Sequence, residues 1–402
     1  MEKLIGTGRT GDVIHNSMEM AKSNDFKNVA KVWYNKTKSF EEGLASIREG
    51  YAQTEDILAV PSEMEPTILN KRLVFKYKDG RTFTPTEHAV KQIGSRLGIG
   101  TWLIESLQKP VVNQKGKILY ERDEQDGNTL CTIINNAKRR LKSTKKYLWR
   151  TRQDGTLRAM LTDKYAIVNN EWLLEVWQRL IPGGRLSHWR GDSDTIYGNI
   201  LIPDSIREED DSDYGGLISG GNSEIGERRV SQFPSVFRAI CCNGCIWDQK
   251  SGQKLDRVHR GKIDLVSLEH KIRINLATQI PLITTMIDTL LATKSFAYDG
   301  DSMKPLFAQV AKDYKLGKPQ TTGIYKGYME EVFDSPVSSR NLFGVINGIT
   351  RAGQKFSNDT WHDFDILGGK LSRFTRENWE NLTSRASKLN VEQTEEMYAL
   401  VS

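Results

Sequence analysis

The sequence predicts an α+β fold in which an antiparallel strand meander is backed by a long kinked helix, with additional helices towards both ends of the chain. Extended runs at residues 187–203, 214–230 and 232–244 are separated by an acidic loop and a Gly-rich turn, which is typical of antiparallel strands. Apolar residues then recur at steps of three and four from 263 to 294, and this period predicts one long helix. The 38% hydrophobic and 27% charged content is typical of a globular protein.

Residues 1–130 are predicted to form an N-terminal helical and hairpin region. Apolar residues at helical spacing from 39 to 57 predict a helix. An Asp79-Gly80 turn between two alternating segments predicts a β-hairpin. Residues 84–107 carry apolar positions on successive turns and predict two short helices.

Residues 131–295 are predicted to form the α+β core. Two strands around a turn at Gly155 are predicted first, and Asn170 is expected to cap a helix with one apolar face. The meander and the long helix follow. Pro281 is expected to kink that helix, because its ring removes a backbone donor and crowds the preceding turn. Residues 296–402 contain several shorter helical patterns and form the predicted C-terminal helical region.

The charge of the whole chain is close to balance. Lys and Arg number 57 against 51 Asp and Glu, so the formal net charge is +6. A surplus of this size fits many proteins, and only the distribution of the charge can indicate a polyanionic partner. The N-terminal residues lack the apolar core of a signal peptide, and no stretch is expected to reach the length of a membrane span. We therefore expect a cytoplasmic protein without membrane contact, whose four cysteines are reduced.

The most basic segment runs from Lys138 to Lys164, where ten Lys and Arg residues accompany two Asp residues. Tyr147 and Trp149 lie among them, and aromatic faces between cations suit a single strand, whose bases stack and whose phosphates are neutralised. The candidate nucleic-acid-binding residues of this segment are Arg139, Arg140, Lys142, Lys145, Lys146, Trp149, Arg150 and Arg152. The alternative interpretation is a solvated helix face that continues into a strand, with Trp149 as a core residue.

A second basic group lies where the meander passes into the long helix. Its candidate nucleic-acid-binding residues are Lys254, Arg257, Arg260 and Lys262. A turn between sheet and helix is a natural place for a groove. Arg228 and Arg229 follow the Gly-rich turn, and they either line the same groove or protect an edge strand from pairing.

Cys241, Cys242 and Cys245, with His259 and His270 downstream, are the residues that could hold zinc. No second Cys pair with suitable spacing exists, and an Ile-Cys-Cys strand end equally suits a buried sheet, so we expect no metal and no cofactor. The Gly-rich segment is not followed by the Lys-Ser/Thr of a phosphate loop. The sequence also contains no nucleophile elbow, no HExxH helix and no deaminase motif.

Four segments carry recognisable motifs: TPTEHAVKQIGSRLGI at 84–99, LTDKYAIVNN at 161–170, NSEIGERRVSQFPSVFRAICCNG at 222–244 and HRGK at 259–262. Together with NLFGVINGITRAG at 341–353, they resemble a family encoded by phages and plasmids that is known only as a domain of unknown function. The order of a helix, three antiparallel strands and a long helix is also similar to the core of phage single-strand annealing proteins of the Beta and RecT type.

The second resemblance implies a function. In annealing proteins a groove between sheet and helix holds DNA by its backbone, subunits assemble into rings or filaments, and no nucleotide is hydrolysed. By this resemblance we expect a phage-type protein of a bacterial host that binds and anneals single-stranded DNA in recombination, as a homo-oligomer and without nucleotide hydrolysis. The alternative is a metal-dependent enzyme acting on nucleic acid or nucleotides, with the Cys cluster or the acidic residues at 208–213 holding the metal. A phage structural or interaction protein is the third possibility.

Overall fold

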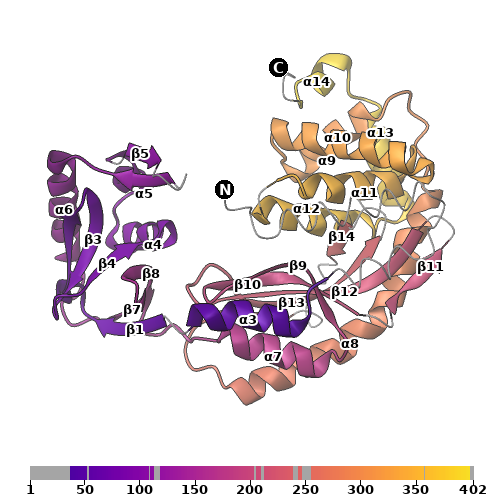
Figure 1. The fold of residues 1–402 in the computed structure, drawn as a ribbon. Helices are drawn as coiled ribbons and strands as arrows, with labels where there is room; N and C mark the ends of the chain where they lie inside the picture. The colour runs from indigo at the N-terminus through magenta and orange to yellow at the C-terminus, as the bar shows by residue number, and fades with distance from the viewer. Residues whose placement is uncertain are drawn as a thin grey trace.

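The computed structural model describes residues 37–51, 54–107, 109–112, 118–202, 205–209, 212–238, 243–246, 255–356 and 358–398. Its helices and mainly antiparallel strands confirm the predicted α+β fold (Figure 1). The strands form two large sheets, one in a unit built from residues 54–162 and one in a larger unit that carries the C-terminal helices.

The first unit is built on a six-stranded sheet with the order β1-β7-β8-β4-β3-β2. Its strands are β1 (Thr54–Ala59), β2 (Met64–Leu69), β3 (Arg72–Tyr77), β4 (Thr82–Pro85), β7 (Tyr147–Arg152) and β8 (Thr156–Thr162). Neighbouring strands pair antiparallel except β4 and β8, which are parallel. The predicted hairpin is confirmed: β3 and β4 pair around Gly80, whose φ of 94° suits glycine.

Helices cover one face of this sheet. They are α4 (Glu87–Leu97), α5 (Thr101–Ser106) and α6 (Glu124–Lys138), and a small hairpin of β5 (Lys109–Val112) and β6 (Ile118–Glu121) precedes α6. The two short helices predicted within residues 84–107 are thus present as α4 and α5. Apolar residues of α4 and α6, such as Ile93 and Ile134, share one buried cluster with Trp149 of β7.

The second unit is built on a larger sheet with the order β14-β13-β12-β10-β9, to which β11 and β15 add short pairings. Its strands are β9 (Arg185–Gly191), β10 (Thr195–Leu201), β11 (Arg207–Glu209), β12 (Ser212–Ser223), β13 (Val230–Arg238), β14 (Asn243–Ile246) and β15 (Leu255–Arg257). β10, β12 and β13 pair antiparallel in sequence order, as the predicted meander requires. The run at 187–203, predicted as one strand, is instead a hairpin of β9 and β10.

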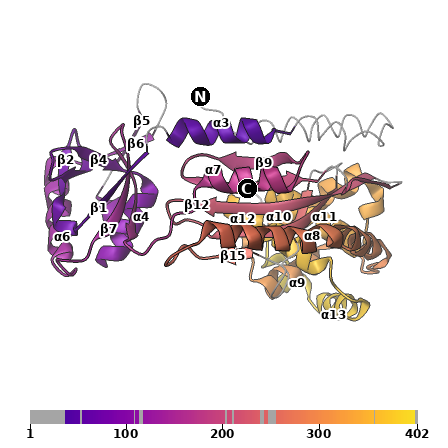
Figure 2. The same ribbon diagram turned by 90° about the horizontal axis from the view of Figure 1, so that it is seen from below.

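This sheet lies between two layers of helices (Figures 1 and 2). One layer contains α3 (Phe40–Tyr51), α7 (Asn170–Leu180) and α8 (Leu265–Ala292). The other contains α9 (Lys304–Tyr314), α10 (Lys318–Asp334), α11 (Leu342–Gly353), α12 (Asn358–Leu371), α13 (Arg376–Ala386) and α14 (Val391–Glu395). Arg238 of β13 bonds to Glu331 of α10 and, at 2.7 Å, to Ser335, which ties the sheet to this second layer.

The predicted long helix is present as α8, which continues through Pro281. Extended to Ser295, it is long and apolar enough by length and composition to cross a membrane, contrary to the expectation that no stretch reaches that length. A helix that covers a core sheet meets the same criteria. In this structure α8 packs against β12 and β13, where the amide of Gln279 and that of Gln232 form a buried hydrogen bond of 3.0 Å.

The helix predicted from 39 to 57 is shorter than expected, because α3 ends at Tyr51 and Ile57 lies in β1. In β1 the buried residues alternate, with Ile57 and Ala59 inward and Leu58 outward, and the strand pairs with β7. The sequence pattern could not show that pairing, since β7 lies some ninety residues further along the chain.

The domain boundaries are also different from the predicted ones. A boundary after residue 130 would cut α6 and would separate β7 and β8 from β1 and β4, with which they pair. A boundary after residue 295 would divide one buried cluster, in which residues of α8 pack with those of the C-terminal helices. The described chain therefore forms one unit from β1 to β8 and a second from α7 onwards, to which α3 also belongs through α7 and β9.

Candidate nucleic-acid interface

We call residues 139–146, which connect α6 to β7, the basic loop. Its five cations, Arg139, Arg140, Lys142, Lys145 and Lys146, are all exposed, and the segment contains no Asp or Glu. None of the five forms an ion pair with a carboxylate of the described residues. Cations just beyond the C-terminus of a helix interact favourably with its dipole, so the first cations of this loop stabilise the end of α6. The basic loop therefore offers positive charge to solvent. Lys146 lies close enough to a carboxylate to affect it, since the pKa of Glu63 is lowered mainly by Lys78 and to a smaller extent by Lys146.

Trp149 lies in the core, which is the alternative that the sequence left open. Only 1% of its surface is exposed, its indole N–H donates to the carbonyl of Ala59 at 3.3 Å, and its ring centroid is 5.9 Å from that of Phe75. Side chains of a strand alternate between two faces, so Tyr147 and Trp149 both point to the face that the helices cover. The prediction that Trp149 stacks on a base is therefore wrong for this conformation.

Arg150 and Arg152 point to the opposite face of β7, towards the second unit. Arg150 is 4% exposed, with its Nε 2.9 Å from Asp56 and one terminal nitrogen 3.1 Å from Glu224. Arg152 is half-buried and pairs with Asp194 at 2.8 Å. Both guanidinium groups already bind carboxylates, so we remove these two residues from the candidate interface.

The arginines of β7 and β8 belong to a polar cluster between the two units, which we call the junction. Its charged residues are Arg150, Arg152, Arg158, Asp56, Asp194 and Glu224. Three guanidinium groups face three carboxyl groups, so each of these arginines already has a carboxyl partner within the junction. Its carboxylates were not among the sequence candidates, because their partners lie far away in the chain.

Four segments that stood out in the sequence meet at the junction. The Tyr165 hydroxyl donates to the carbonyl of Ser223 at 2.6 Å, and the backbone N–H of Asn170 donates to Glu224 at 2.8 Å. On the other side of Glu224, the side-chain amide of Gln92 in α4 donates to the carbonyl of Ile225 at 2.7 Å. These bonds join motifs at 84–99, 161–170 and 222–244.

His259, from the fourth segment, completes the junction. Its ring stacks on Tyr165 with centroids 4.9 Å apart, and its Nδ1 lies 2.8 Å from the carbonyl of Ala166. Burial lowers the pKa of His259, so the ring is neutral at neutral pH and Nδ1 is the donor. Burial also raises the pKa of Glu224. The hydrogen bond from Asn170 and the nearby Arg150 act in the opposite direction, because both favour the ionised carboxylate. The motifs thus build a buried joint between the units.

The second basic group is partly described. Arg257, Arg260 and Lys262 are exposed on β15 and the turn that follows, while Lys254 lies outside the described residues. The backbone N–H of Gly261 donates to the carbonyl of Lys164 at 3.0 Å, which brings exposed Lys164 beside this turn. These four cations form the second exposed basic surface of the molecule.

Arg228 and Arg229 each contact another side chain, so neither is an unengaged cation of that surface. Arg228 is half-buried, with its guanidinium 4.7 Å from the centre of the Tyr197 ring. Arg229 is exposed and pairs with Asp256 of β15 at 3.2 Å. β15 is a short strand at the side of β13, so Arg229 follows the edge-strand interpretation more closely than the groove interpretation.

The groove expected between the sheet and the long helix is filled by side chains. A Cβ added to Gly216 of β12 would lie 2.4 Å from Ile283 of α8, and one added to Gly220 would lie 2.6 Å from Trp177 of α7. The glycines of this segment therefore let helices approach the strand closely, and most of them lie within β12 and not in a turn. A nucleic acid has no space between α8 and this sheet.

The residues considered for a metal lie partly outside the described part of the chain. Asp210, Asp211, Cys241 and Cys242 lie outside it, and only the backbone of Cys245 is described, in β14. Within the described ranges no group of three His, Cys, Asp or Glu side chains could hold a metal ion. Of the acidic segment at 208–213, Glu209 pairs with Arg207, which also binds Asp288 of α8.

Comparison with known proteins gave no match: no family model, curated protein or solved structure is similar to this chain at the level that would count as a relationship.

Proposed function

We propose that the protein binds and anneals single-stranded DNA through its basic loop, without hydrolysing a nucleotide. The observation that carries this proposal is the separation of two kinds of cation within one basic segment. Arg150, Arg152 and Arg158 are paired with carboxylates at the junction, whereas the five cations of the basic loop are exposed and form no ion pair within the described residues. Phosphates of a polyanion are the partner that such a loop suits best.

Binding of this kind has a measurable signature. Each Lys or Arg that neutralises a phosphate of a single strand releases counterions, and log Kd changes with log salt by about 0.7 per contact. If all five cations of the basic loop take part, their share of the slope is about 3.5. The second basic surface, with Lys164, Arg257, Arg260 and Lys262, would add to this slope if one strand reaches both surfaces.

The test is a salt titration of binding to single- and double-stranded oligonucleotides with a variant in which Lys142, Lys145 and Lys146 are replaced by Ala. The slope should fall by about 2 for the single strand, because three contacts are lost. A matched control replaces Lys312, Lys318 and Lys326, three exposed lysines of α9 and α10, and removes the same charge elsewhere. Equal slopes for both variants would remove the basic loop from the binding site.

Annealing requires many protomers on one strand, so the proposal includes a homo-oligomer. The outer face of α8 supports self-association, since Val266 is 78% exposed and Ile274 is 52% exposed. Sedimentation with and without oligonucleotide tests this part separately. A monomer under both conditions would leave a DNA-binding protein that does not assemble.

A further inference from the structure

We propose that the outer face of α6 contacts the bases of the single strand whose phosphates lie on the basic loop. This inference rests on the proposed function and extends it, because it assigns a base-contacting surface beside the phosphate-binding one. The two surfaces are continuous in the chain, since α6 ends at Lys138 and the basic loop starts at the next residue.

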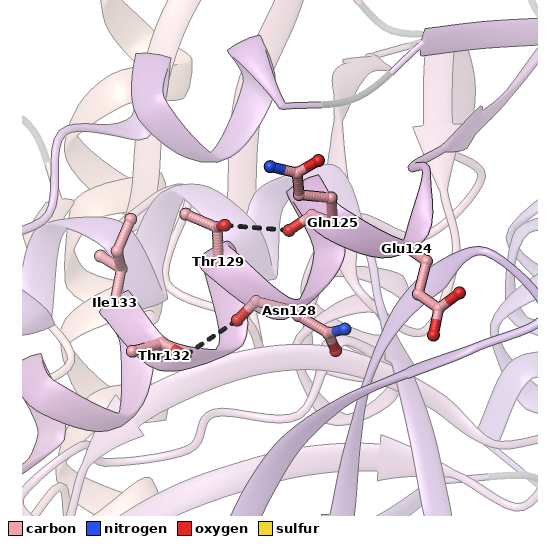
Figure 3. A pocket seen from close by; sticks show the side chains of 6 residues that line it. All are labelled: Glu124, Gln125, Asn128, Thr129, Thr132 and Ile133. Carbon is pink, nitrogen blue, oxygen red and sulfur yellow. Dashed lines mark hydrogen bonds between the residues drawn. The ribbon is translucent and has the colours of Figure 1, made fainter.

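The outer face of α6 is polar but uncharged over its middle turns. Gln125, Asn128, Thr129 and Thr132 are exposed there, and they line a hollow of about 630 Å³ together with Glu124 and Ile133 (Figure 3). At steps of three and four residues the same face continues to Asn136 and Arg139, which are also exposed. The helix therefore presents one continuous stripe of amides and hydroxyls that ends in the basic loop.

The hydrogen-bonding groups of this stripe are available to a ligand. The hydroxyls of Thr129 and Thr132 donate to the carbonyls of Gln125 and Asn128 at 2.9 and 3.0 Å, and each hydroxyl oxygen can still accept a hydrogen bond. The side-chain amides of Gln125 and Asn128 have no hydrogen-bond partner among the described residues. Each of these amides carries a donor and an acceptor side by side, the pattern that matches the edge of an adenine base.

The charges along α6 determine how a strand would lie. Asp123, Glu124 and Asp126 stand at the N-terminus of the helix, where its dipole favours carboxylates, and the five cations stand beyond its C-terminus. Phosphates are repelled from the first end and attracted to the second. A strand held on the basic loop by its backbone can place neighbouring bases on the uncharged middle turns, and unpaired bases expose the edges that amides contact.

The experiment compares two single strands of equal length and charge, one with adenine bases and one with abasic sites, in a fluorescence anisotropy titration. Wild-type protein should bind the adenine strand more tightly. The double variant Gln125→Ala/Asn128→Ala should lower this preference roughly 5- to 100-fold, the range expected for amide contacts to a base, with an unchanged salt slope. Gln153→Ala, an exposed amide in the turn between β7 and β8, is the matched control and should behave as wild type.

The outcomes separate this inference from the proposed function. Equal wild-type affinity for the adenine and abasic strands, with a salt slope that depends on the basic loop, would overturn the base contact and leave the DNA-binding proposal standing. A double variant that weakens both strands equally would also overturn it, because the amides would then not touch bases. No binding of either strand by the wild type would remove both proposals together.

Discussion

Replacement of Trp149 by Ala should reduce stability strongly and should affect DNA binding only through that loss. The side chain is 1% exposed within the cluster that joins β3, β7, α4 and α6, so its removal leaves a large cavity. Truncation of a buried Trp costs about 3–5 kcal/mol, and the lost hydrogen bond to Ala59 contributes to this cost. For a unit of this size, a loss of 3 kcal/mol lowers the melting temperature by more than ~10 °C.

The assay follows thermal unfolding by circular dichroism, and binding of a single-stranded oligonucleotide is measured well below the melting temperature. Trp102→Ala is the control, because Trp102 of α5 belongs to the same unit and is 70% exposed. The control should melt close to wild type. The reasoning is refuted if Trp149→Ala melts like the control while its affinity for DNA falls, since Trp149 would then act at the surface.

Three further predictions concern the junction and the thiol chemistry of the first unit. Glu224→Ala should cost about 1–3 kcal/mol by chemical denaturation, because it removes the buried acceptor of the Asn170 backbone N–H and of one Arg150 N–H, whereas Glu377→Ala on the exposed start of α13 should cost less than about 0.5 kcal/mol. Burial lowers the folded-state pKa of His259, so the unfolded chain binds more protons and the free energy of unfolding should decrease as the pH falls below ~6.5. His259→Gln should reduce this loss of stability at low pH, and an unchanged pH profile would count against the burial of His259. Burial raises the pKa of the Cys131 thiol, so Cys131 should react with a thiol reagent at neutral pH more slowly than a free cysteine does, and equal rates in native and denatured protein would contradict this.

The sequence predicted those parts of the fold that depend on local periodicity. Apolar steps of three and four gave α7 and α8, and alternation around Gly80 gave the hairpin of β3 and β4. The parts that were wrong depend on pairing between distant segments. β7 joins β1 and β8 joins β4, and nothing in a basic segment around Trp149 indicates that its partners begin at Thr54.

The candidate site shows the same limit. Exposure of Lys142, Lys145 and Lys146 follows from a polar loop between a helix and a strand, and the sequence pattern was sufficient for it. The burial of Arg150 was not predictable, because it depends on Asp56, its distant cross-strand partner in the same sheet, and on Glu224, which comes from the second unit. The sequence of a basic segment alone does not distinguish a cation that neutralises a phosphate from one that neutralises a buried carboxylate.

The junction sets a condition on how the basic loop can act. β7 begins directly after the loop, and its fourth and sixth residues, Arg150 and Arg152, are held by carboxylates of the other unit. A buried charge separated from its partner costs several kcal/mol, so the start of β7 is fixed relative to the second sheet and cannot move freely with a ligand. The loop is therefore anchored at one end by α6 and at the other by the junction. Binding of single-stranded DNA to such a loop costs little conformational entropy of the protein, which favours a useful affinity even though few cations take part.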